Sequence, residues 1–436
     1  MADRLAAELV IVGAGPAGIA AAVHAAESRR GVVVLDPSPR PGGQIWRHHG
    51  EPAHAARPWL ARLAGSGATV LADATVIDAP ARGALLVERL GRAVDVRFET
   101  LVLATGASEL FLPFPGWTLP GVIGAGAAQA LRESGARFDG RRVVVAGSGP
   151  LLVAAAAALV RAGARIVGIA EQAPAARIAA FGAGLAFHPG KLAEGLGHVA
   201  RLRGVSVRTG AWVREAVGRE RVERVVVSDG RHEWPWDCDL LACGFGLVPN
   251  LELARLLGCA TTPDRVVVDD SQRTSERPVF AAGELCGIAG AGHALVTGAI
   301  AGLAAAGANV PGALLRRRRR ERAFAARLSR AVALRDELRT RGRPDTIVCR
   351  CEDVTLARVQ EAARLDVERL AMTRCVKLHA RAGMGACQGR VCGAALRFLF
   401  GWNADTIRPP LLPAPLSLLA QGGEDHKARV TQEEEP

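Results

Sequence analysis

Short apolar runs that end at glycine recur along the chain, and the first of them opens a strand–turn–helix–strand pattern. Residues Glu8–Val12 predict a buried strand that enters the turn Gly13-Ala14-Gly15-Pro16-Ala17-Gly18. A run of small residues then predicts a helix, and Gly31–Leu35 predicts a second strand that ends in Asp36. The glycines of such a turn allow a tight bend, close approach of the backbone to a pyrophosphate and close helix–strand packing. The pattern therefore predicts a dinucleotide site in which the Asp36 carboxylate accepts hydrogen bonds from the ribose hydroxyls.

A second copy of the pattern begins with the predicted strand Val143–Ala146, which leads into Gly147-Ser148-Gly149-Pro150-Leu151-Leu152. The strand Arg165–Ala170 follows and ends in Glu171, which keeps the ribose-binding position. Leu152 replaces the third glycine, so we expect the helix to lie further from the strand. Two interpretations stay open: a structural remnant of a Rossmann repeat, or a second nucleotide site that uses Gly147, Gly149 and Glu171.

Three further apolar strands end at small or acidic residues, and they indicate how the two copies are joined. They span Thr100–Gly106 with the turn Ala104-Thr105-Gly106, Asp239–Gly244, and Val279–Glu284 with Gly283 before the acid Glu284. A carboxylate at such a strand end can accept a hydroxyl of a ribityl or ribose group. The predicted fold class is α/β, with two Rossmann-like dinucleotide-binding domains of which the second is inserted in the first.

The remaining segments differ in composition and set the predicted boundaries. Residues 1–115 and 245–312 form the first nucleotide domain, 116–244 the second, 313–345 a charged linker helix, 346–402 a small cysteine-bearing domain, and 403–436 a Pro-rich segment with a disordered tail. The run Arg316–Arg320 lies in the linker. We interpret it as a solvated helix face, with docking of an acidic partner as the alternative.

Composition limits the classes of function. The chain has 49% hydrophobic and 22% charged residues and a net charge of +12, yet its arginines are mostly dispersed. Only 4% of residues are aromatic and none is Tyr, which argues against nucleic-acid binding because stacking platforms are scarce. No apolar stretch is long and uninterrupted enough for a membrane span, and charged residues near the start argue against a secretory signal. A cytoplasmic protein is expected, with peripheral attachment to the inner face of the membrane as an alternative.

Four cysteines near the C-terminus form two close pairs. They are Cys349 and Cys351 in a Cys-x-Cys, and Cys387 and Cys392 in a glycine-rich stretch. Two such pairs can converge on one metal centre. The tight first pair and the glycines around Cys387 suit a [2Fe–2S] cluster, whose sulfides need backbone N–H groups close by. Structural zinc and unligated thiols remain alternatives. The other cysteines are expected in the core, namely Cys238, Cys243, Cys259, Cys286 and Cys375.

Together these motifs resemble the two-dinucleotide-binding-domain flavoproteins over roughly residues 8–310, fused to a domain similar to the bacterioferritin-associated-ferredoxin type. The combination resembles one group in particular, the larger subunits of opine oxidases, hydrogen cyanide synthases and heteromeric proline, hydroxyproline or sarcosine dehydrogenases. The resemblance rests on Gly42-Gly43-Gln44-Ile45-Trp46-Arg47, Gly147–Leu152, Ala282-Gly283-Glu284, Gly383–Cys392 and the closing Arg408–Pro413.

The resemblance implies FAD in the first site, near Gly43 and Gln44, or a plain nucleotide such as ATP in its place. It implies a [2Fe–2S] cluster on the four cysteines and leaves NAD(P) in the second site open. Amine oxidation would occur on a smaller FAD subunit similar to D-amino-acid dehydrogenases, with room for a further small subunit. This chain would relay electrons to a carrier or quinone. It departs from the usual pattern at Glu284, where flavoproteins of this type carry Asp.

Several chemistries lack their residues. The flavin domains contain no Cys-x-x-Cys, so a dithiol reductase mechanism has no nucleophile. No hydrolase triad or paired carboxylate stands out, and no catalytic residue is assigned. Two other functions stay in view: an autonomous NAD(P)H-dependent FAD/iron–sulfur reductase, and a non-catalytic assembly subunit with structural zinc and nucleotide.

Overall fold

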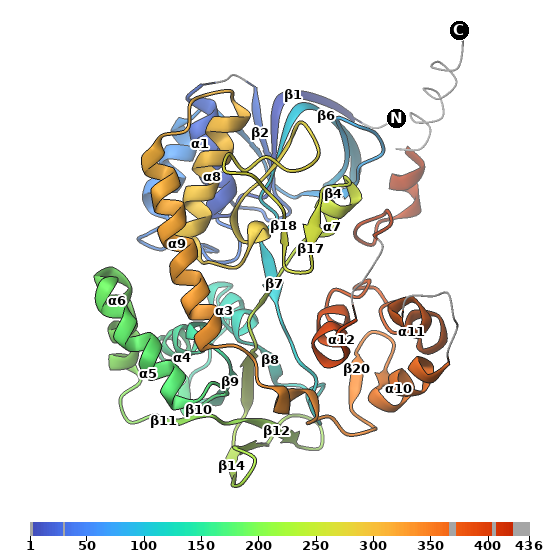
Figure 1. Ribbon diagram of the computed structural model, residues 1–436. Coiled ribbons are helices and arrows are strands. Elements are labelled where there is room, and N and C mark those ends of the chain that lie inside the picture. The colour runs from blue at the N-terminus through green and yellow to red at the C-terminus, as the bar shows by residue number, and fades with distance from the viewer. Residues whose placement is uncertain (1–2, 29–30, 366–371, 403–406, 422–436) are drawn as a thin grey trace. The chain divides into compact units, whose positions relative to one another are not determined.

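The computed structural model describes residues 3–28, 31–365, 372–402 and 407–421 (Figure 1). The chain forms two compact units, one made of Met1–Ser108, Pro249–Ala325 and Thr406–Pro436, the other of Glu109–Val248 and Ala326–Asp405. The chain therefore leaves the first unit, builds most of the second and returns. Both units contain parallel strands with helical crossovers, which confirms the predicted α/β class with Rossmann-like architecture. The tail predicted to be disordered lies outside the described residues from 422 onward.

The first unit is built on a seven-stranded sheet. Its order is β3 (Thr69–Leu71), β2 (Val32–Leu35), β1 (Asp3–Val12), β6 (Arg92–Leu103), β5 (Ala84–Arg89) and β4 (Ala74–Asp78), with β19 (Val279–Ala281) also paired to β6. The strands β3, β2, β1, β6 and β19 run parallel, whereas β5 pairs antiparallel with both β6 and β4. The parallel strands end together, so the residues after them meet at one edge.

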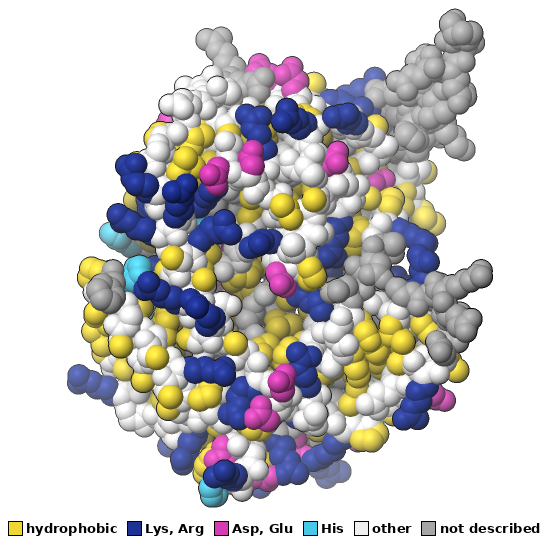
Figure 2. All heavy atoms as spheres, in the orientation of Figure 1, with side chains coloured by type: hydrophobic (Ala, Val, Ile, Leu, Met, Phe, Trp, Pro, Cys, Tyr) yellow, Lys and Arg dark blue, Asp and Glu magenta, His cyan; other side chains and the backbone are white. Residues whose placement is uncertain are grey.

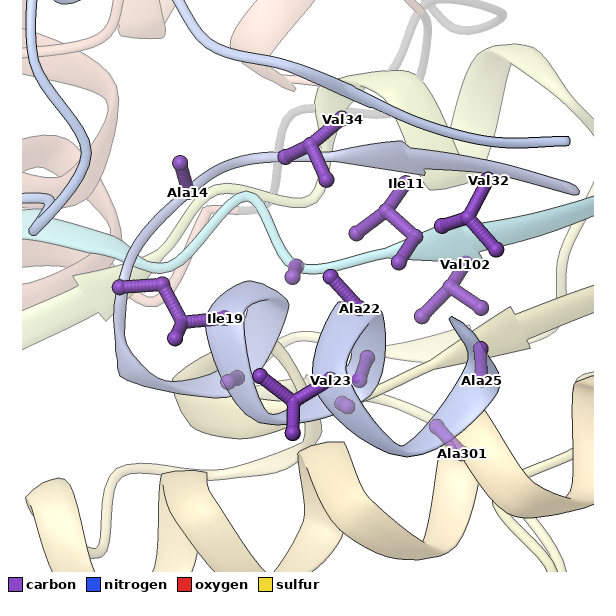
Figure 3. Packing of buried hydrophobic residues seen from close by; sticks show 14 of the residues in the cluster. Ile11, Ala14, Ile19, Ala22, Val23, Ala25, Val32, Val34, Val102 and Ala301 are labelled. Carbon is purple, nitrogen blue, oxygen red and sulfur yellow. The ribbon is translucent and has the colours of Figure 1, made fainter. Parts of the chain in front are cut away.

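Both faces of this sheet are buried, which is why β2 and the second half of β1, Leu9–Val12, are continuously apolar. Leu9 and Ile11 point to the face covered by α1 (Pro16–Ala26) and α8 (Ala291–Ala305), as Figure 3 shows for Ile11. Val10 and Val12 point to the opposite cluster. The shorter elements of this unit are α2 (Arg57–Gly65), α7 (Glu252–Leu256), β17 (Thr261–Thr262), β18 (Arg265–Val266) and the 3₁₀ turn Gly283–Cys286. The paired strands β7 (Ala107–Glu109) and β16 (Leu247–Pro249) each include a point where the chain passes from one unit to the other.

The second unit contains a five-stranded sheet in the order β11 (Ser206–Thr209), β10 (Arg165–Glu171), β9 (Arg142–Gly147), β15 (Leu240–Gly244) and β8 (Val122–Gly124), all parallel. A three-stranded antiparallel sheet accompanies it, formed by β12 (Trp212–Val217), β13 (Arg224–Ser228) and β14 (Glu233–Asp237). The helices are α3 (Ala125–Glu133), α4 (Pro150–Arg161), α5 (Ala175–Gly184) and α6 (Pro189–Arg201), with a 3₁₀ turn at Leu185–Phe187.

The cysteine-bearing segment folds into a hairpin and three short helices. The elements are β20 (Ile347–Cys349), β21 (Val354–Thr355), α10 (Leu356–Arg364), α11 (Met372–Ala380) and α12 (Cys392–Phe400). Cys349 and Cys392 belong to its hydrophobic cluster, together with Val348, Val359 and Leu396. Two of the four predicted ligand cysteines thus belong to this small core.

The predicted linker helix is shorter than expected. Helix α9 spans Gly312–Ala331, and only a 3₁₀ turn at Asp336–Arg339 follows it, so the prediction of a helix to 345 is wrong beyond Ala331. The arginine run lies in α9, and four of its members are exposed as predicted. Arg318 is buried instead, because its guanidinium donates to the carbonyl of Asp270 at 2.8 Å and pairs with the carboxylate of Asp270.

Basic side chains are dispersed over the face shown in Figure 2, where acidic and apolar side chains separate them. The view agrees with the dispersed arginines of the sequence and shows no single large basic patch on this face. Within the part of the chain that the structure describes, no helix has the length and apolarity needed to cross a bilayer.

Candidate functional site

The first glycine-rich turn joins β1 to α1 at the edge where the parallel strands end. Gly13 has φ +105°, a conformation that favours glycine, and a Cβ there would lie 2.3 Å from the carbonyl oxygen of Ala104. A Cβ on Gly18 would lie 1.7 Å from the carbonyl oxygen of Gly13. Gly15, by contrast, has no contact closer than 3.8 Å at its Cβ position. Gly13 and Gly18 are thus needed for packing, whereas Gly15 has no packing constraint of its own and fits the position at which the backbone would approach a pyrophosphate.

Asp36 lies directly after β2 and is 5% exposed. Its carboxylate accepts hydrogen bonds from the backbone N–H of Ala14 at 2.5 Å and of Ser38 at 2.8 Å. These contacts hold the carboxylate beside the glycine-rich turn. The carboxylate at the predicted ribose-binding position therefore lies next to the turn predicted for the pyrophosphate.

The other segments predicted for the first site gather at the same edge. The N–H of Gly42 donates to the carbonyl of Ala14 at 2.8 Å, and a Cβ on Gly43 would lie 2.7 Å from the Cα of Gly15. The residues Ala104, Thr105 and Gly106 follow β6, and a Cβ on Gly283 would lie 2.7 Å from the Cβ of Ala17. Gln44 is exposed and accepts from Arg47 at 2.8 Å. The structure brings four distant segments to one turn.

Glu284 makes a contact that the sequence does not suggest. Its carboxylate accepts from the backbone N–H of Gly290 at 2.8 Å, at the start of α8. Burial raises the pKa of Glu284, and the N–H groups of Gly290 and Ala289 lower it in part. In this structure the carboxylate is thus directed to its own loop, where it faces the amino-terminal end of a helix.

A buried histidine on α8 escaped the sequence analysis. His293 is 3% exposed, and no described residue hydrogen-bonds its Nδ1. Burial lowers its pKa to about 4, and the charges of Arg322 and Arg318 contribute. The imidazole is therefore neutral at neutral pH. No sequence signal marks this position, because the two arginines that act on it belong to α9, a separate helix.

The depressed pKa predicts acid sensitivity. The unfolded chain takes up a proton at the ordinary histidine pKa near 6.5, whereas the folded chain resists protonation down to about 4. Stability is then full above pH 6.5 and falls as pH drops toward 4, by about 3 kcal/mol. We expect His293→Gln to flatten this part of the pH–stability curve in denaturant melts. His49→Gln, at an exposed histidine of the same unit, is the control and should keep the wild-type slope.

The acid of the second glycine-rich turn is arranged like that of the first. Glu171 ends β10, and its carboxylate accepts from the backbone N–H of Gly149 at 2.6 Å and of Ala173 at 2.8 Å. Burial raises the pKa of Glu171, while those N–H groups and the Ser148 hydroxyl lower it in part. Gly147 has φ +139°, and a Cβ there would lie 1.9 Å from the carbonyl oxygen of Gly244. The predicted residues Gly147, Gly149 and Glu171 do lie together.

The four predicted ligand cysteines interact with one another. Burial raises the pKa of Cys392, followed by the effects of Cys349, Cys387 and Cys351. The N–H of Cys387 lowers the pKa of Cys351, but the Cys387 thiol, burial and Cys349 together outweigh it, so that pKa is raised. Among the described residues, however, no group of three or more His, Cys, Asp or Glu has the arrangement of a metal site. The thiols are neighbours without forming a preorganised coordination sphere.

Backbone N–H groups converge on Cys387. Burial raises the pKa of its thiol, but the N–H groups of Val391, Gly389 and Arg390 and the Cys351 thiol lower it further, so the net shift is downward. The loop comes very close to the first pair, since a Cβ on Gly385 would lie 2.3 Å from the Cβ of Cys351. Thiolates held by backbone N–H groups are suited to iron–sulfur ligation. The chemistry of the donor set fits such a cluster.

Four of the five remaining cysteines are buried in the core, as predicted, and the fifth packs against it. Cys238, Cys243, Cys259 and Cys375 are buried, whereas Cys286 is partly exposed. Cys375 lies in the same segment as the four predicted ligands but donates its S–H to the carbonyls of Ala362 at 3.5 Å and Leu365 at 3.3 Å. These bonds use the protonated thiol, which sets Cys375 apart from the predicted ligands.

Comparison with known proteins agrees with the fold. The chain matches the family model described as pyridine nucleotide-disulphide oxidoreductase over residues 7–305. The solved L-proline dehydrogenase of P. horikoshii superposes with a TM-score of 0.67 over 96% of this chain and 80% of that chain, at 19% identity. At this identity the likeness concerns the fold alone.

Two curated relatives extend over nearly the whole sequence. Hydrogen cyanide synthase subunit HcnB of Pseudomonas aeruginosa is 32% identical over 94% of this chain and 97% of the relative. An opine oxidase subunit from Agrobacterium tumefaciens is 34% identical over 89% of this chain and 84% of the relative. The chain is thus a homologue of these subunits and belongs to the pyridine nucleotide-disulphide oxidoreductase family.

Proposed function

We propose that this chain is the electron-transfer subunit of a heteromeric flavoenzyme that oxidises the C–N bond of an amino acid or opine. One observation carries the proposal: a complete dinucleotide-binding turn and a cluster of four interacting thiols occur in the same chain. The first suits a carrier of electron pairs, and the second suits a carrier of single electrons. The relatives named as subunits of an opine oxidase and a hydrogen cyanide synthase support it.

The residues of the first turn would hold FAD. Gly15 would allow its backbone to approach the pyrophosphate, while Asp36 would accept the adenosine ribose hydroxyls. Gly43 packs against Gly15 and would close one side of the site. Glu284 would need to leave the N–H of Gly290 to reach the flavin tail. ATP in place of FAD would use the same pyrophosphate and ribose contacts. When bound, FAD would exchange electron pairs with a donor and pass them on singly.

The four thiols would hold a [2Fe–2S] cluster, which supplies reversible one-electron transfer. Cys349 and Cys392 are buried and would shield it, whereas Cys351 is exposed and would mark its open side. The N–H groups of Gly389, Arg390 and Val391 already point to Cys387 and would stabilise its charge. The other thiols help to raise the pKa of Cys351 and of Cys392, so a bound cation would favour the ionised form of these two ligands.

Amine oxidation itself is assigned to a partner. The proposed partner is a smaller FAD-dependent subunit of the D-amino-acid-dehydrogenase type, and a further small subunit would complete the assembly. The substrate would be proline, hydroxyproline, sarcosine or an opine. Electrons would leave through a carrier or quinone, in the cytoplasm or at the inner face of the membrane. We propose no nucleic-acid partner, because the chain offers few aromatic platforms.

Reduction experiments separate this proposal from its rivals. The purified chain should show flavin and iron–sulfur absorbance that persists anaerobically after addition of NADH. It should bleach only when the amine is supplied together with the partner subunit. Bleaching of the isolated chain by NADH would instead identify an autonomous reductase. Zinc without acid-labile sulfide would identify a non-catalytic assembly role. As a control, dithionite should bleach the isolated chain and show that its centres can be reduced.

A further inference from the structure

The two glycine-rich turns differ in backbone conformation although their sequences are alike. Gly15 is extended at φ −76° and ψ −176°, whereas its counterpart Gly149 has φ +93°. The first turn requires Gly18, whose Cβ would lie 1.7 Å from a carbonyl oxygen. Leu152 occupies the corresponding position of the second turn and is 1% exposed. The second turn has therefore abandoned the geometry that brings the backbone of the first turn close to a pyrophosphate.

A segment far along the chain lies on the second turn. The segment is Val332–Arg335, which follows α9 and which we call the strap. The Ser148 hydroxyl donates to the carbonyl of Val332 at 2.8 Å. The Gln172 side-chain amide donates to the carbonyls of Val332 and Ala333, both at 3.3 Å. The N–H of Arg335 donates in return to the amide oxygen of Gln172 at 3.0 Å. Gln172 is fully buried, so these bonds are shielded from water.

Apolar and aromatic contacts fix both ends of the strap. A Cβ on Gly149 would lie 3.6–3.7 Å from the side-chain carbons of Val332, so this side chain covers the glycine. At the other end, the Arg335 guanidinium lies 5.0 Å from the ring centre of Trp212 and donates to the carbonyl of Gly210 at 3.4 Å. Leu334 packs against the hydrophobic cluster of the unit. The strap is held along its length.

We infer that the strap is the resident occupant of the second dinucleotide turn and excludes NAD(P)H from it. A pyrophosphate needs open space above the second glycine and free N–H groups in the turn. Val332 covers Gly149, and the N–H of Gly149 is bonded to Glu171. The carboxylate contact alone does not decide the matter, because Asp36 makes a similar one in the first turn. The two turns differ in what lies beside the second glycine: the Cα of Gly43 in the first turn, and the branched side chain of Val332 in the second.

Binding measurements on the full chain with its first site loaded with FAD test this inference. We expect no saturable binding of NADH or NADPH in calorimetric titrations up to about 1 mM. Hydrogen exchange should show protected amides at Val332 and Arg335, whose N–H groups are hydrogen-bonded, and NADH should not change this protection. Saturable binding with a Kd below about 0.1 mM, accompanied by changed exchange in the strap, would overturn the inference.

Release of the strap should allow the second turn to bind NADH. Gln172→Ala removes both bonds to the strap carbonyls and the acceptor for Arg335, and Ser148→Ala removes the remaining polar bond to Val332. We expect the double variant to expose the strap to exchange and to bind NADH at least about tenfold more tightly than wild type, since opening no longer limits binding. Gln129→Ala on α3, which breaks a glutamine hydrogen bond in the same unit, should change neither readout.

An exposed strap without any gain in NADH affinity would overturn the inference, because another barrier would then close the turn. If the double variant fails to fold, Gln172→Ala alone is assessed by the same two readouts.

Two results keep this inference apart from the proposed function. Binding of NADH to the wild-type chain without bleaching would contradict the inference and leave the electron-transfer proposal standing. A wild-type chain purified without iron and sulfide would contradict the electron-transfer proposal and leave the inference about the strap unaffected.

Discussion

Serine in place of any one of Cys349, Cys351, Cys387 and Cys392 is expected to remove iron from the chain. The wild type should carry about two iron and two sulfide per chain, and each variant well under half of that. The reason is coordination number: with three thiolates the cluster loses a ligand, and a serine hydroxyl is a poor replacement. Iron, acid-labile sulfide and visible absorbance measure the effect. Serine adds no volume at these positions, and far-UV circular dichroism checks that each variant stays folded.

Cys375→Ser is the matched control for this series. It lies in the same segment, but its S–H donates to the carbonyls of Ala362 and Leu365, and a serine hydroxyl can donate likewise. The control should retain full iron. Full iron in one of the four variants would remove that residue from the ligand set. Iron loss in Cys375→Ser alone would overturn the assignment as a whole, and zinc in the wild type would favour the structural-metal alternative.

Gly18→Ala is expected to abolish nucleotide retention by the first unit. The added Cβ would lie 1.7 Å from the carbonyl oxygen of Gly13, a backbone atom that cannot rotate away. Helix α1 must then move off the turn, at a cost of about 3 kcal/mol, and the pyrophosphate-binding backbone moves with it. The measurements are flavin content after purification and the thermal midpoint.

Gly65→Ala is its control, because a Cβ at that position has nothing within 4 Å. The control should keep both the flavin and the thermal midpoint of wild type. A Gly18→Ala variant with full flavin and an unchanged midpoint would show that the turn tolerates a Cβ and that its described geometry is wrong. If Gly18→Ala does not fold, Asp36→Asn tests the nucleotide contact without adding volume, and it should weaken FAD retention.

The first turn was predictable because its signals are local. A strand, three spaced glycines and an acid at the next strand end all lie between Glu8 and Asp36, and each has a separate conformational reason. The cysteine cluster was predictable for a similar reason, since the spacing of the two cysteine pairs and the glycines beside them are visible in the sequence. That the four thiols hold a metal stays a proposal.

Three features needed the folded chain. Helix α9 ends at Ala331 without a nearby glycine or proline, where the carbonyl of Val332 meets Ser148 and Gln172. Arg318 is buried among exposed neighbours of the same type, because only it reaches Asp270. His293 is neutralised by burial and by arginines from α9. In each case the partner lies far away in sequence, and the local pattern is unchanged by it.

The sequence by itself determined the α/β class, the two glycine-rich turns, their acids and the grouping of four cysteines. These follow from periodicity and from short-range backbone requirements, which neighbouring residues specify. Only the tertiary structure decided that Val332–Arg335 lies over the second turn. The strap that covers the second turn lies 160 residues from Gln172 along the chain. Hydrogen bonds and packing depend on how close two groups are in space and not on their separation along the chain. A local sequence pattern therefore cannot tell whether a distant segment covers a nucleotide turn.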